Sequence, residues 1–564
     1  MANTISITEY LLRRLKELNV NHLFGIPGDY VLPFFDELID CDTGVAHVGS
    51  KNELNAGYSA DGYAKINGFG AAAVTFGVGT LSTVNAVAGA YSDNTPMVLI
   101  TGAPSRSARP NNGGKLLHHL LGTDFDTCMK IMSEVTIEAL RLDSENTAPA
   151  EIDALLITSF RHKKPVYLEI PYDLQQAQVT APASALQLNY PMSNAERLSD
   201  AVDKIKRLAL ASSAISSLVG PLLDRNRLIS EADQVIRTLN AAVATVFTAK
   251  IPDFEDHPQA AGFYQGMSCE DACRDAIEGS DLIITFGSTF NEFDTGMFTA
   301  KLGIDQNEVH LCNDHVIVDG EYIMDVYLCD ILPALAKALE GGTYPALQLD
   351  TEARKFAFQL DDAFEPTNAD LKIDRMFIQF ANSLHAGDTL VGDTGGYINS
   401  AQAQFRSGVS IYGCGNWGSL GAGFGMSVGA SIARSEAPQG EVVCITGDGA
   451  FLMSAQELAT LVQHEINITL IVLDNAGYGA ERQIWPGKER SYNDFLPWNY
   501  EQLPAVFGGI EGKNCQGFIA RSEKEFDTAL KAARTIQGVK VIRAHIDRWD
   551  TASFNVKMSE AMRH

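Results

Sequence analysis

The residue types best suited to bind a metal lie in Gly-Asp-Gly at 447–449 and at Asn475, with Gly477 just beyond. Apolar runs at residues 442–446 and 468–473 precede the two groups. Two short apolar runs separated by a helix-length segment are typical of a βαβ unit, which places both polar groups at the C-terminal ends of its strands. A carboxylate and an amide there favour Mg²⁺ carrying a diphosphate over zinc. The pattern therefore predicts a metal-bridged diphosphate site.

A helix must join the two strands. Residues 454–457, Ser-Ala-Gln-Glu, have the form of a capping box, and Leu458, Leu461 and Val462 supply an apolar stripe. We expect a helix that begins at this box and packs on the sheet.

The motif resembles that of thiamine diphosphate enzymes, and the resemblance extends along essentially the whole chain. The 2-oxo acid decarboxylases of the pyruvate, indolepyruvate, phenylpyruvate and branched-chain types are the most similar group. Further matching segments lie at residues 24–30, 52–64, 118–119 and 479–482. The combination is much more specific than the Gly-Asp-Gly motif alone.

The resemblance implies a lyase that converts a 2-oxo acid to an aldehyde and CO₂ with thiamine diphosphate and Mg²⁺. Glu53 would hydrogen-bond the cofactor's pyrimidine and promote its activation, a role for which burial can tune a glutamate. Asp29, His118, His119 and Glu481 match the family's acid–base positions. The metal ligands would be Asp448, Asn475 and the carbonyl of Gly477. Expected cofactor contacts are Glu53, Thr394, Gly418, Ser419, Leu420, Gly447, Asp448, Gly449, Ala450, Asn475, Gly477 and Tyr478.

The same resemblance implies an oligomer. In the family, the glutamate corresponding to Glu53 comes from one subunit and the Gly-Asp-Gly segment from its partner. We therefore expect a homodimer at minimum, usually paired into a homotetramer as a dimer of dimers.

The substrate pocket is expected at Ala480, Ile484, Ile398 and Phe293. In pyruvate-specific relatives, a bulkier Ile is typical at the position of Ala480, a large aromatic at Ile398, and a Tyr at Phe293. These differences predict a wider and more apolar pocket for larger aliphatic or aromatic 2-oxo acids. A pyruvate-preferring decarboxylase is the alternative.

Three other functions compete with this interpretation. Residues 413–418 match G-x-G-x-x-G after a strand-like run, with Glu436 near the acidic position of a nicotinamide enzyme. That alternative leaves Glu53 and the Asp448–Asn475 pair unexplained, and by resemblance Gly418 and Leu420 hold the aminopyrimidine. A carboligase of the acetolactate synthase type would not need the histidine pair and Glu481 for protonation. A non-catalytic scaffold would not need any of the acid–base residues.

Composition narrows the class of partner. The 564 residues are 46% hydrophobic and 20% charged, an ordinary globular balance, and the net charge is −27. Such a charge argues against a nucleic-acid partner and increases the need for a divalent cation, because cofactor and substrate are both anions.

Two features of the sequence favour a cytoplasmic protein: its nine cysteines have no paired spacing, and it shows no signal segment. The uncharged stretches 66–92 and 407–433 are rich in glycine and polar residues, which favours a strand, a glycine turn and a packed helix over a membrane span.

The chain is expected to be α/β throughout, with three doubly wound parallel-sheet domains. These are an N-terminal pyrimidine-binding domain (1–180), a central domain (195–342) and a C-terminal diphosphate- and Mg²⁺-binding domain (357–564). Linkers are expected at about 175–195 and 341–356. A second capping box, at 6–9, begins the first helix, and glycine turns near 77–80 and 413–421 suggest a duplication. Expected strands are 22–25, 71–76, 97–101, 166–171, 216–219, 243–247, 282–286 and 308–312; expected helices include 53–65 and 81–91.

Overall fold

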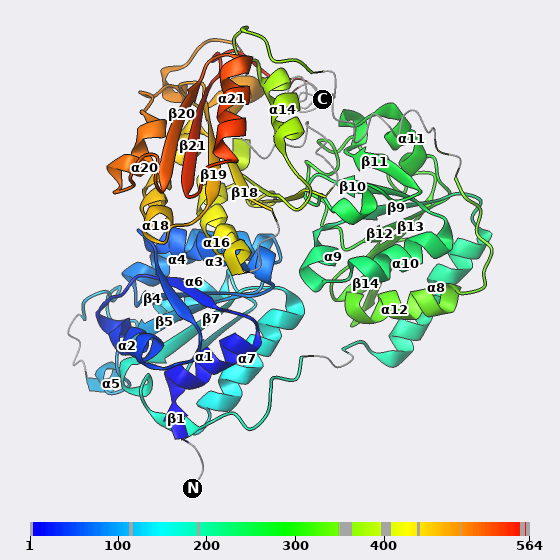
Figure 1. Ribbon diagram of the computed structural model, residues 1–564. Helices are drawn as coiled ribbons and strands as arrows, with labels where there is room; N and C mark the ends of the chain where they lie inside the picture. The colour runs from blue at the N-terminus through cyan, green and yellow to red at the C-terminus, as the bar shows by residue number, and fades with distance from the viewer. Residues whose placement is uncertain are drawn as a thin grey trace.

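Three sheets, each covered by helices, make up the protein (Figure 1). The computed structural model describes residues 4–111, 117–188, 192–347, 349, 364–395, 408–436, 440–485, 487–552, 556 and 559. Each expected domain range contains one of the sheets, while the exact domain boundaries stay a prediction. The α/β architecture is confirmed.

The N-terminal sheet is six-stranded and parallel, in the order β3-β2-β4-β5-β7-β6. Its central strands are buried on both faces, which explains their continuous apolar sequence.

The first helix begins at half of the expected capping box, because the Ser6 side chain accepts a hydrogen bond from the Glu9 amide at 2.9 Å. A short antiparallel ribbon, not predicted from the sequence, pairs β1 at the N-terminus with β8, which lies inside the expected linker. The bounds are β1 (Thr4–Ser6), α1 (Ile7–Glu17), β2 (His22–Gly25), α2 (Leu32–Asp40), β3 (Ala46–Gly49), α3 (Glu53–Asn67), β4 (Gly70–Thr75), α4 (Val78–Ser92), β5 (Met97–Ala103), α6 (Thr127–Ser133), β6 (Glu138–Arg141), α7 (Ala148–His162), β7 (Val166–Pro171) and β8 (Gln178–Thr180).

The C-terminal sheet repeats this topology. Its order β17-β16-β18-β19-β21-β20 follows the same succession of strands along the chain, and all pairings are parallel. The shared order strengthens the suggested duplication. The bounds are α14 (Ile373–Ser383), β16 (Thr389–Gly392), β17 (Ser410–Gly413), α16 (Ala422–Glu436), β18 (Val442–Gly447), α17 (Asp448–Phe451), α18 (Leu458–Gln463), β19 (Ile468–Asp474), α19 (Gly479–Ile484), α20 (Leu503–Val506), β20 (Cys515–Ala520), α21 (Glu523–Ala533) and β21 (Val539–His545).

The middle sheet differs from the other two. It has seven strands in the order β11-β10-β9-β12-β13-β14-β15, and an antiparallel extension, β14 and β15, continues its parallel part. The two antiparallel strands were not predicted from the sequence. The bounds are α8 (Ala195–Ala211), β9 (Ile215–Val219), α9 (Pro221–Asn226), α10 (Ile229–Leu239), β10 (Ala242–Val246), β11 (Ala260–Tyr264), α11 (Asp271–Glu278), β12 (Leu282–Phe286), β13 (Asn307–Leu311), β14 (His315–Val318), β15 (Glu321–Met324) and α12 (Leu328–Leu339).

Helices α3 and α16 cross where the first and last domains meet (Figure 1). A Cβ at Gly429 would collide with the carbonyl oxygen of Ser59, and one at Gly62 with that of Met426. Glycine is therefore required for the close approach of the two helices. This accounts for the glycine-rich composition of one membrane-like stretch. Among the helices in the part of the chain that the structure describes, none combines the length and apolar character needed to cross a bilayer.

A buried lysine also ties these two domains together. Lys65 Nζ lies 3.1 Å from Asp61 Oδ2 and 2.8 Å from Asp93 Oδ2, and it donates to the carbonyl of Gly413 at 3.0 Å. All three charged side chains are buried. The ammonium therefore links α3, the end of α4 and the end of β17.

The capping box expected at 454–457 is wrong. The Ser454 hydroxyl donates to the carbonyl of Gly421 at 2.9 Å, and the Glu457 carboxylate accepts from the Lys51 amide at 2.7 Å. Both side chains are buried at the domain junction, where distant partners replace the local cap. The helix α18 begins after these two residues. A complete capping box does occur elsewhere in the described chain, at Ser522 and Glu525, where it begins α21.

Candidate active site

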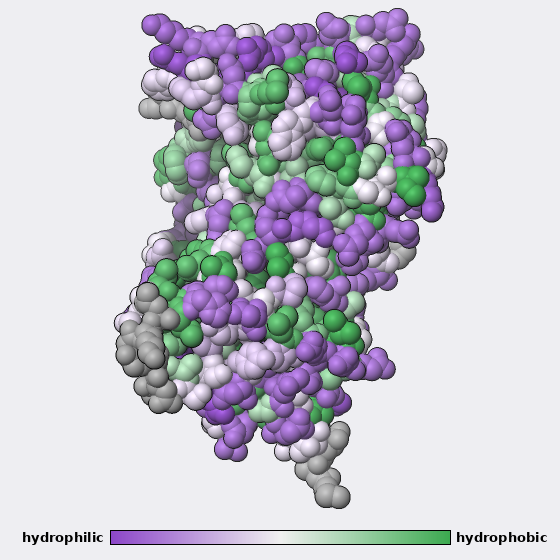
Figure 2. Space-filling model, turned by 90° about the vertical axis from the view of Figure 1, so that its left-hand side faces the viewer, coloured by the Kyte–Doolittle hydropathy of each residue, from purple (hydrophilic) through white to green (hydrophobic). Residues whose placement is uncertain are grey.

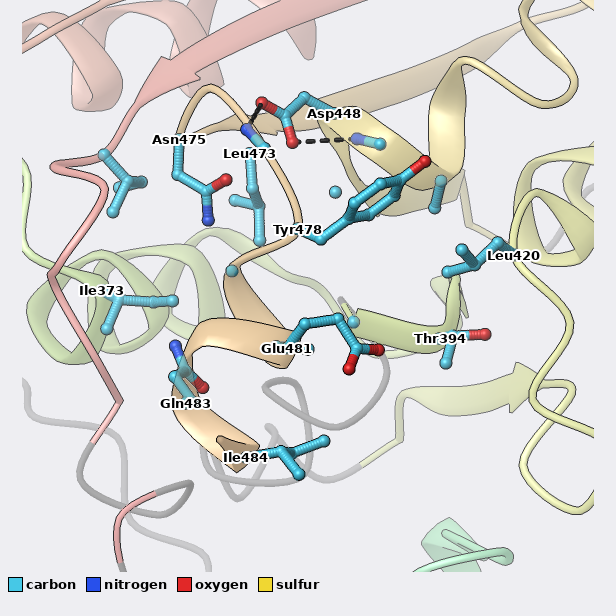
Figure 3. Close-up of a pocket in the computed structure, with 18 of the residues that line it drawn as sticks. Ile373, Thr394, Leu420, Asp448, Leu473, Asn475, Tyr478, Glu481, Gln483 and Ile484 are labelled. Atoms are coloured by element: carbon cyan, nitrogen blue, oxygen red, sulfur yellow. Dashed lines mark hydrogen bonds between the residues drawn. The ribbon is translucent and has the colours of Figure 1, made fainter. Parts of the chain in front are cut away.

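A cavity of about 1000 Å³, part of it open to solvent, lies at the C-terminal ends of strands in the last sheet (Figure 3). This is where open parallel sheets hold ligands. Twelve of the predicted site residues line it: Thr394, Leu420, Gly447, Asp448, Gly449, Ala450, Asn475, Gly477, Tyr478, Ala480, Glu481 and Ile484. Ile373, Leu473, Gln483 and Ile546, which the sequence analysis did not identify, also line it.

Asp448 follows β18 directly and is only 1% exposed. Its Oδ1 accepts from the Gly449 amide at 2.8 Å, and its Oδ2 accepts from the Gly477 amide at 3.2 Å. Burial, reinforced by the negative charge of Asp474, raises the pKa of Asp448 to about 7. The position therefore suits a carboxylate whose charge a cation would compensate.

Asn475 ends the neighbouring strand. Its side-chain oxygen is buried and has no hydrogen-bond partner among the residues that the structure describes. A buried polar atom without a partner is costly, and coordination to an ion would satisfy it. The next two residues make a tight turn, with φ of 56° at Ala476 and 151° at Gly477. An oxygen from Asp448, the orphan oxygen of Asn475 and a carbonyl oxygen form a donor set that fits Mg²⁺.

Glycines leave room beside these oxygens. A Cβ added at the lining residues Gly395 or Gly447 would meet nothing within 4 Å. The backbone is thus open toward a ligand at two points around the site. The residues present fit a diphosphate that shares a divalent ion with Asp448.

One residue that the sequence analysis missed, Asp393, shapes the wall opposite. Its fully buried carboxylate accepts from the amides of Gly421 at 3.0 Å and Phe424 at 3.3 Å. It therefore fixes the start of α16 and the adjoining loop that carries Leu420. Leu420 is 40% exposed and points into the cavity (Figure 3). The position of Asp393, at the end of a short apolar strand, was the available sequence signal.

The two other predicted contacts in this loop do not line the cavity. Ser419 is held from the first domain, because its hydroxyl lies 2.8 Å from the Tyr58 hydroxyl and 2.9 Å from Asn85 Nδ2. Gly418 adopts φ of 66° next to it. Both residues therefore set the backbone from which Leu420 projects.

A second group of predicted residues gathers in the first domain. His118 Nε2 makes a short hydrogen bond with Asp29 Oδ2, and His119 Nδ1 lies 3.8 Å from Asp29 Oδ1. The Tyr30 ring stacks on His118 at 5.0 Å. Burial opposes the shift, but the hydrogen bond from His118 and the charges of both histidines lower the pKa of Asp29. The predicted acid–base residues of this domain thus form one cluster.

Glu53 is the first residue of α3 and is half-buried. The Asn52 side chain caps this helix by accepting from the Asn55 amide at 2.7 Å, and Glu457 holds the preceding Lys51 amide. Within the described residues, the cavity wall includes neither Glu53 nor the Asp29–His118–His119 cluster. A single chain therefore does not bring the two predicted halves of the site together.

Two predicted pocket residues remain apart from the cavity. Phe293, in the middle domain, packs against Phe247 with ring centroids 5.2 Å apart and is not among the described lining residues. Ile398 lies outside the described residues. Ala480 and Ile484 line the cavity, as the sequence predicts.

The G-x-G-x-x-G segment serves domain contacts. The Asn416 amide donates to Asp93 Oδ1 at 3.2 Å, and Trp417 Nε1 donates to Asn85 Oδ1 at 2.7 Å. Glu436 is likewise engaged, because it accepts from the Tyr63 hydroxyl at 2.7 Å. The features that suggested a dinucleotide therefore have structural roles.

Comparison with known proteins agrees with the geometry. Family models described as thiamine pyrophosphate enzyme match in three parts: the N-terminal TPP binding domain at residues 5–128, the central domain at 202–339 and the C-terminal TPP binding domain at 391–544. The chain is 30% identical to a pyruvate decarboxylase of Aspergillus fumigatus, covering 92% of this chain and 90% of that one. It is 31% identical to an alpha-keto-acid decarboxylase of Mycobacterium tuberculosis, covering 94% and 92%.

Two further proteins extend the comparison. Pyruvate decarboxylase isozyme 1 of Saccharomyces cerevisiae is 32% identical, with 89% of each chain covered. Among solved structures, a thiamine diphosphate-dependent 4-hydroxybenzoylformate decarboxylase of Rhodococcus jostii RHA1 superposes with a TM-score of 0.74 at 20% identity, covering 96% of this chain and 99% of that one. At this identity the structural likeness establishes the fold alone.

Proposed function

This chain belongs to the family of thiamine diphosphate-dependent 2-oxo acid decarboxylases, and we propose that it anchors its cofactor through Mg²⁺ held by Asp448, Asn475 and the Gly477 carbonyl. The observation that carries the proposal is the partnerless side-chain oxygen of Asn475 beside the buried carboxylate of Asp448. The open backbone at Gly447 leaves space for the diphosphate. The enzyme converts a 2-oxo acid to an aldehyde and CO₂.

Thiamine diphosphate, when bound, supplies the electron sink that makes loss of CO₂ possible. In this proposal Leu420, Thr394 and Tyr478 would contact the cofactor from the cavity wall, and Ser419 would hold the backbone behind Leu420. The carboxyl group of Glu53 would hydrogen-bond the cofactor's pyrimidine ring and so promote its activation. Glutamine at position 53 should keep much of the cofactor affinity but abolish turnover, whereas near-normal turnover would remove Glu53 from this role.

Proton transfer falls to two groups of side chains. Glu481 points toward the middle of the cavity (Figure 3). Asp29 is already hydrogen-bonded to His118, with His119 beside it, so protons can be exchanged within this cluster. A carboligase of the acetolactate synthase type would release an acyloin instead, so analysis of the products from a single 2-oxo acid distinguishes the two reactions.

We further propose that the working unit is a homodimer at minimum, with a homotetramer as the usual assembly. The separation of Glu53 from the cavity within one chain supports this, because a partner subunit would supply the missing half. Leu420 and Ile484 at the cavity are 40% and 39% exposed, and Trp485, which follows Ile484 in the sequence, is 77% exposed. Figure 2 shows hydrophobic side chains in several small groups among hydrophilic ones on one face of the molecule. A partner would cover such side chains.

Complementation between chains tests this arrangement. Glu53→Gln and Asp448→Asn chains, each inactive alone, are co-expressed with different tags, and the mixed dimers are isolated. Each mixed dimer would contain one complete site, so about half of the wild-type activity per dimer is expected. If both halves came from one chain, every site in the mixed dimer would be defective. Absence of recovered activity in intact mixed dimers would therefore refute the shared site.

We also propose that the preferred substrates are larger aliphatic or aromatic 2-oxo acids. The cavity walls carry Ile373, Leu473 and Ile546, and the small side chain of Ala480 leaves space beside them. Values of kcat/KM should be higher for phenylpyruvate and 2-oxoisovalerate than for pyruvate. A higher value for pyruvate would support the pyruvate-preferring alternative.

We also propose a cytoplasmic location, with which the nine free cysteines are in keeping.

A further inference from the structure

Arg482 is buried, although it follows the cavity residue Glu481 on the short helix α19. Its guanidinium donates to three backbone carbonyls: to that of Asn475 at 3.4 Å, to that of Ala476 at 3.3 Å and to that of Asn493 at 3.4 Å. We propose that Arg482 is a positioning residue that holds the loop 475–477 in the shape that binds the metal. This inference rests on the Mg²⁺ site proposed above.

The loop needs such support. Ala476 has φ of 56°, in the left-handed region where its Cβ is crowded, so the unsupported loop would favour other conformations. The two guanidinium bonds fix the carbonyls of Asn475 and Ala476. The following Gly477 amide is then able to donate to Asp448 Oδ2 at 3.2 Å. The loop is therefore tied to Arg482 through its carbonyls and to Asp448 through an amide.

Backbone packing on the other side restricts the same loop. Gly477 forms an isolated antiparallel bridge with Asp494, and the Tyr478 amide donates to the Asn493 carbonyl at 2.9 Å. A Cβ at Gly477 would collide with the Asn493 carbonyl oxygen and with Arg482 Nη2. At Gly477 the loop lies between the arginine and the segment at 493–494, with no space there for a side chain.

The charge of Arg482 is neutralised locally, so it does not simply repel a metal ion. Arg482 Nη2 lies 2.6 Å from Asp494 Oδ1, and Arg548 Nη2 lies 2.6 Å from the same oxygen. Arg548 also pairs with Glu489 at 2.6 Å. Arg548 shares the aspartate but makes none of the contacts with the carbonyls of residues 475 and 476. It is therefore a matched control for the loss of an arginine from this network.

The test compares Arg482→Met, Arg482→Lys and Arg548→Met with the wild-type oligomer. Equilibrium dialysis measures Mg²⁺-dependent retention of thiamine diphosphate, and circular dichroism checks that each apoprotein is folded. Loss of a residue that orients metal ligands typically weakens metal affinity about 10- to 100-fold, and we expect this for Arg482→Met. Arg548→Met should change the affinity less than about 3-fold. Lysine retains the charge but not the planar fork, so an intermediate loss is expected.

A second change separates positioning from general damage. Glycine adopts positive φ without the crowding of a Cβ, so Ala476→Gly added to Arg482→Met should recover part of the lost affinity. At saturating Mg²⁺, kcat of Arg482→Met should fall less than its Mg²⁺ affinity. The inference is overturned if folded Arg482→Met binds Mg²⁺ and cofactor as tightly as the wild type, if Arg548→Met loses as much, or if Ala476→Gly recovers nothing.

The two proposals fail in different ways. Wild-type protein that retains no thiamine diphosphate with Mg²⁺ would refute the proposed function and this inference with it. Wild-type protein that binds both, alongside an Arg482→Met variant that binds them equally well, would refute the positioning role alone. Should the methionine variant not fold, Arg482→Lys decides: unchanged affinity overturns the role, and weakened affinity supports it.

Discussion

Replacement of Lys65 by methionine should loosen the junction between the first and last domains. The ammonium lies 2.8 Å from Asp93 and 3.1 Å from Asp61, and the three side chains are 1%, 6% and 3% exposed, respectively. Methionine has a similar length, so it leaves little empty space. The change therefore removes one charge and leaves two carboxylates in a site closed to water.

The expected cost follows from that burial. Removal of one partner from a buried ion pair typically costs about 3–5 kcal/mol, because the remaining charge is uncompensated. The lost hydrogen bond to the Gly413 carbonyl adds about 1 kcal/mol. Burial already raises the pKa of Asp61, and without Lys65 this carboxyl can escape its buried charge by taking up a proton. The cost should therefore be largest near pH 8 and smaller near pH 5.5.

Hydrogen exchange of amides in α3 and α16 measures the effect where it arises. A total cost of about 4–6 kcal/mol corresponds to roughly 10³- to 10⁴-fold more frequent opening, and exchange should accelerate accordingly. The control is Asp61→Asn/Lys65→Met/Asp93→Asn, which removes all three charges and should restore most of the protection. The reasoning would be refuted if the amide exchange rates of Lys65→Met lay within tenfold of those of the wild type. It would also be refuted if the triple variant exchanged as fast as the single one.

Three other changes probe the fold and the pocket. The Arg375 hydrogen bond lowers the pKa of Glu523 to about 2, so the stabilisation from this carboxylate is present above pH 4.5 and is lost as the pH falls toward 2. The stabilities of wild type and Glu523→Gln, measured by unfolding at each pH, should differ above pH 4.5 and converge near pH 2. A constant difference between them across this range would contradict the prediction. Gly429→Ala forces a methyl group against Ser59 and should cost about 1–3 kcal/mol, seen as a lower thermal midpoint, whereas an unchanged midpoint would show that the helices can separate freely. Ala480→Ile adds three carbons to the cavity wall, so kcat/KM for phenylpyruvate should fall about 10- to 100-fold relative to that for pyruvate, and an equal fall for both would exclude a role in size selection.

Strands with continuous apolar runs could be predicted closely from the sequence. The strands at 22–25, 166–171 and 282–286 have the predicted bounds, because burial on both faces leaves a plain signal in composition. Short or half-exposed strands such as β14 and β15 carry no such signal. The capping box at 454–457 failed for a different reason: its serine and glutamate have partners that lie far away along the chain.

The metal half of the site was predictable because its residues follow two adjacent strands. Asp448 and Asn475 need only the βαβ unit to meet, and the spacing of the motif contains that information. The roles of Arg482 and Asp393 depend on backbone groups that they reach after folding, which residue type and spacing do not reveal. A charged residue beside Glu481 could equally have been a solvated helix face, and burial alone distinguishes the two.

The repeated strand order has a consequence for how the chain can change over time. Helices α3 and α16 occupy equivalent places in their sheets, so their crossing brings equivalent elements of two similar halves into contact within one polypeptide. Glycines from both helices lie in this contact. A substitution at this crossing on either helix therefore affects both halves, and the sequences of the two helices constrain each other there.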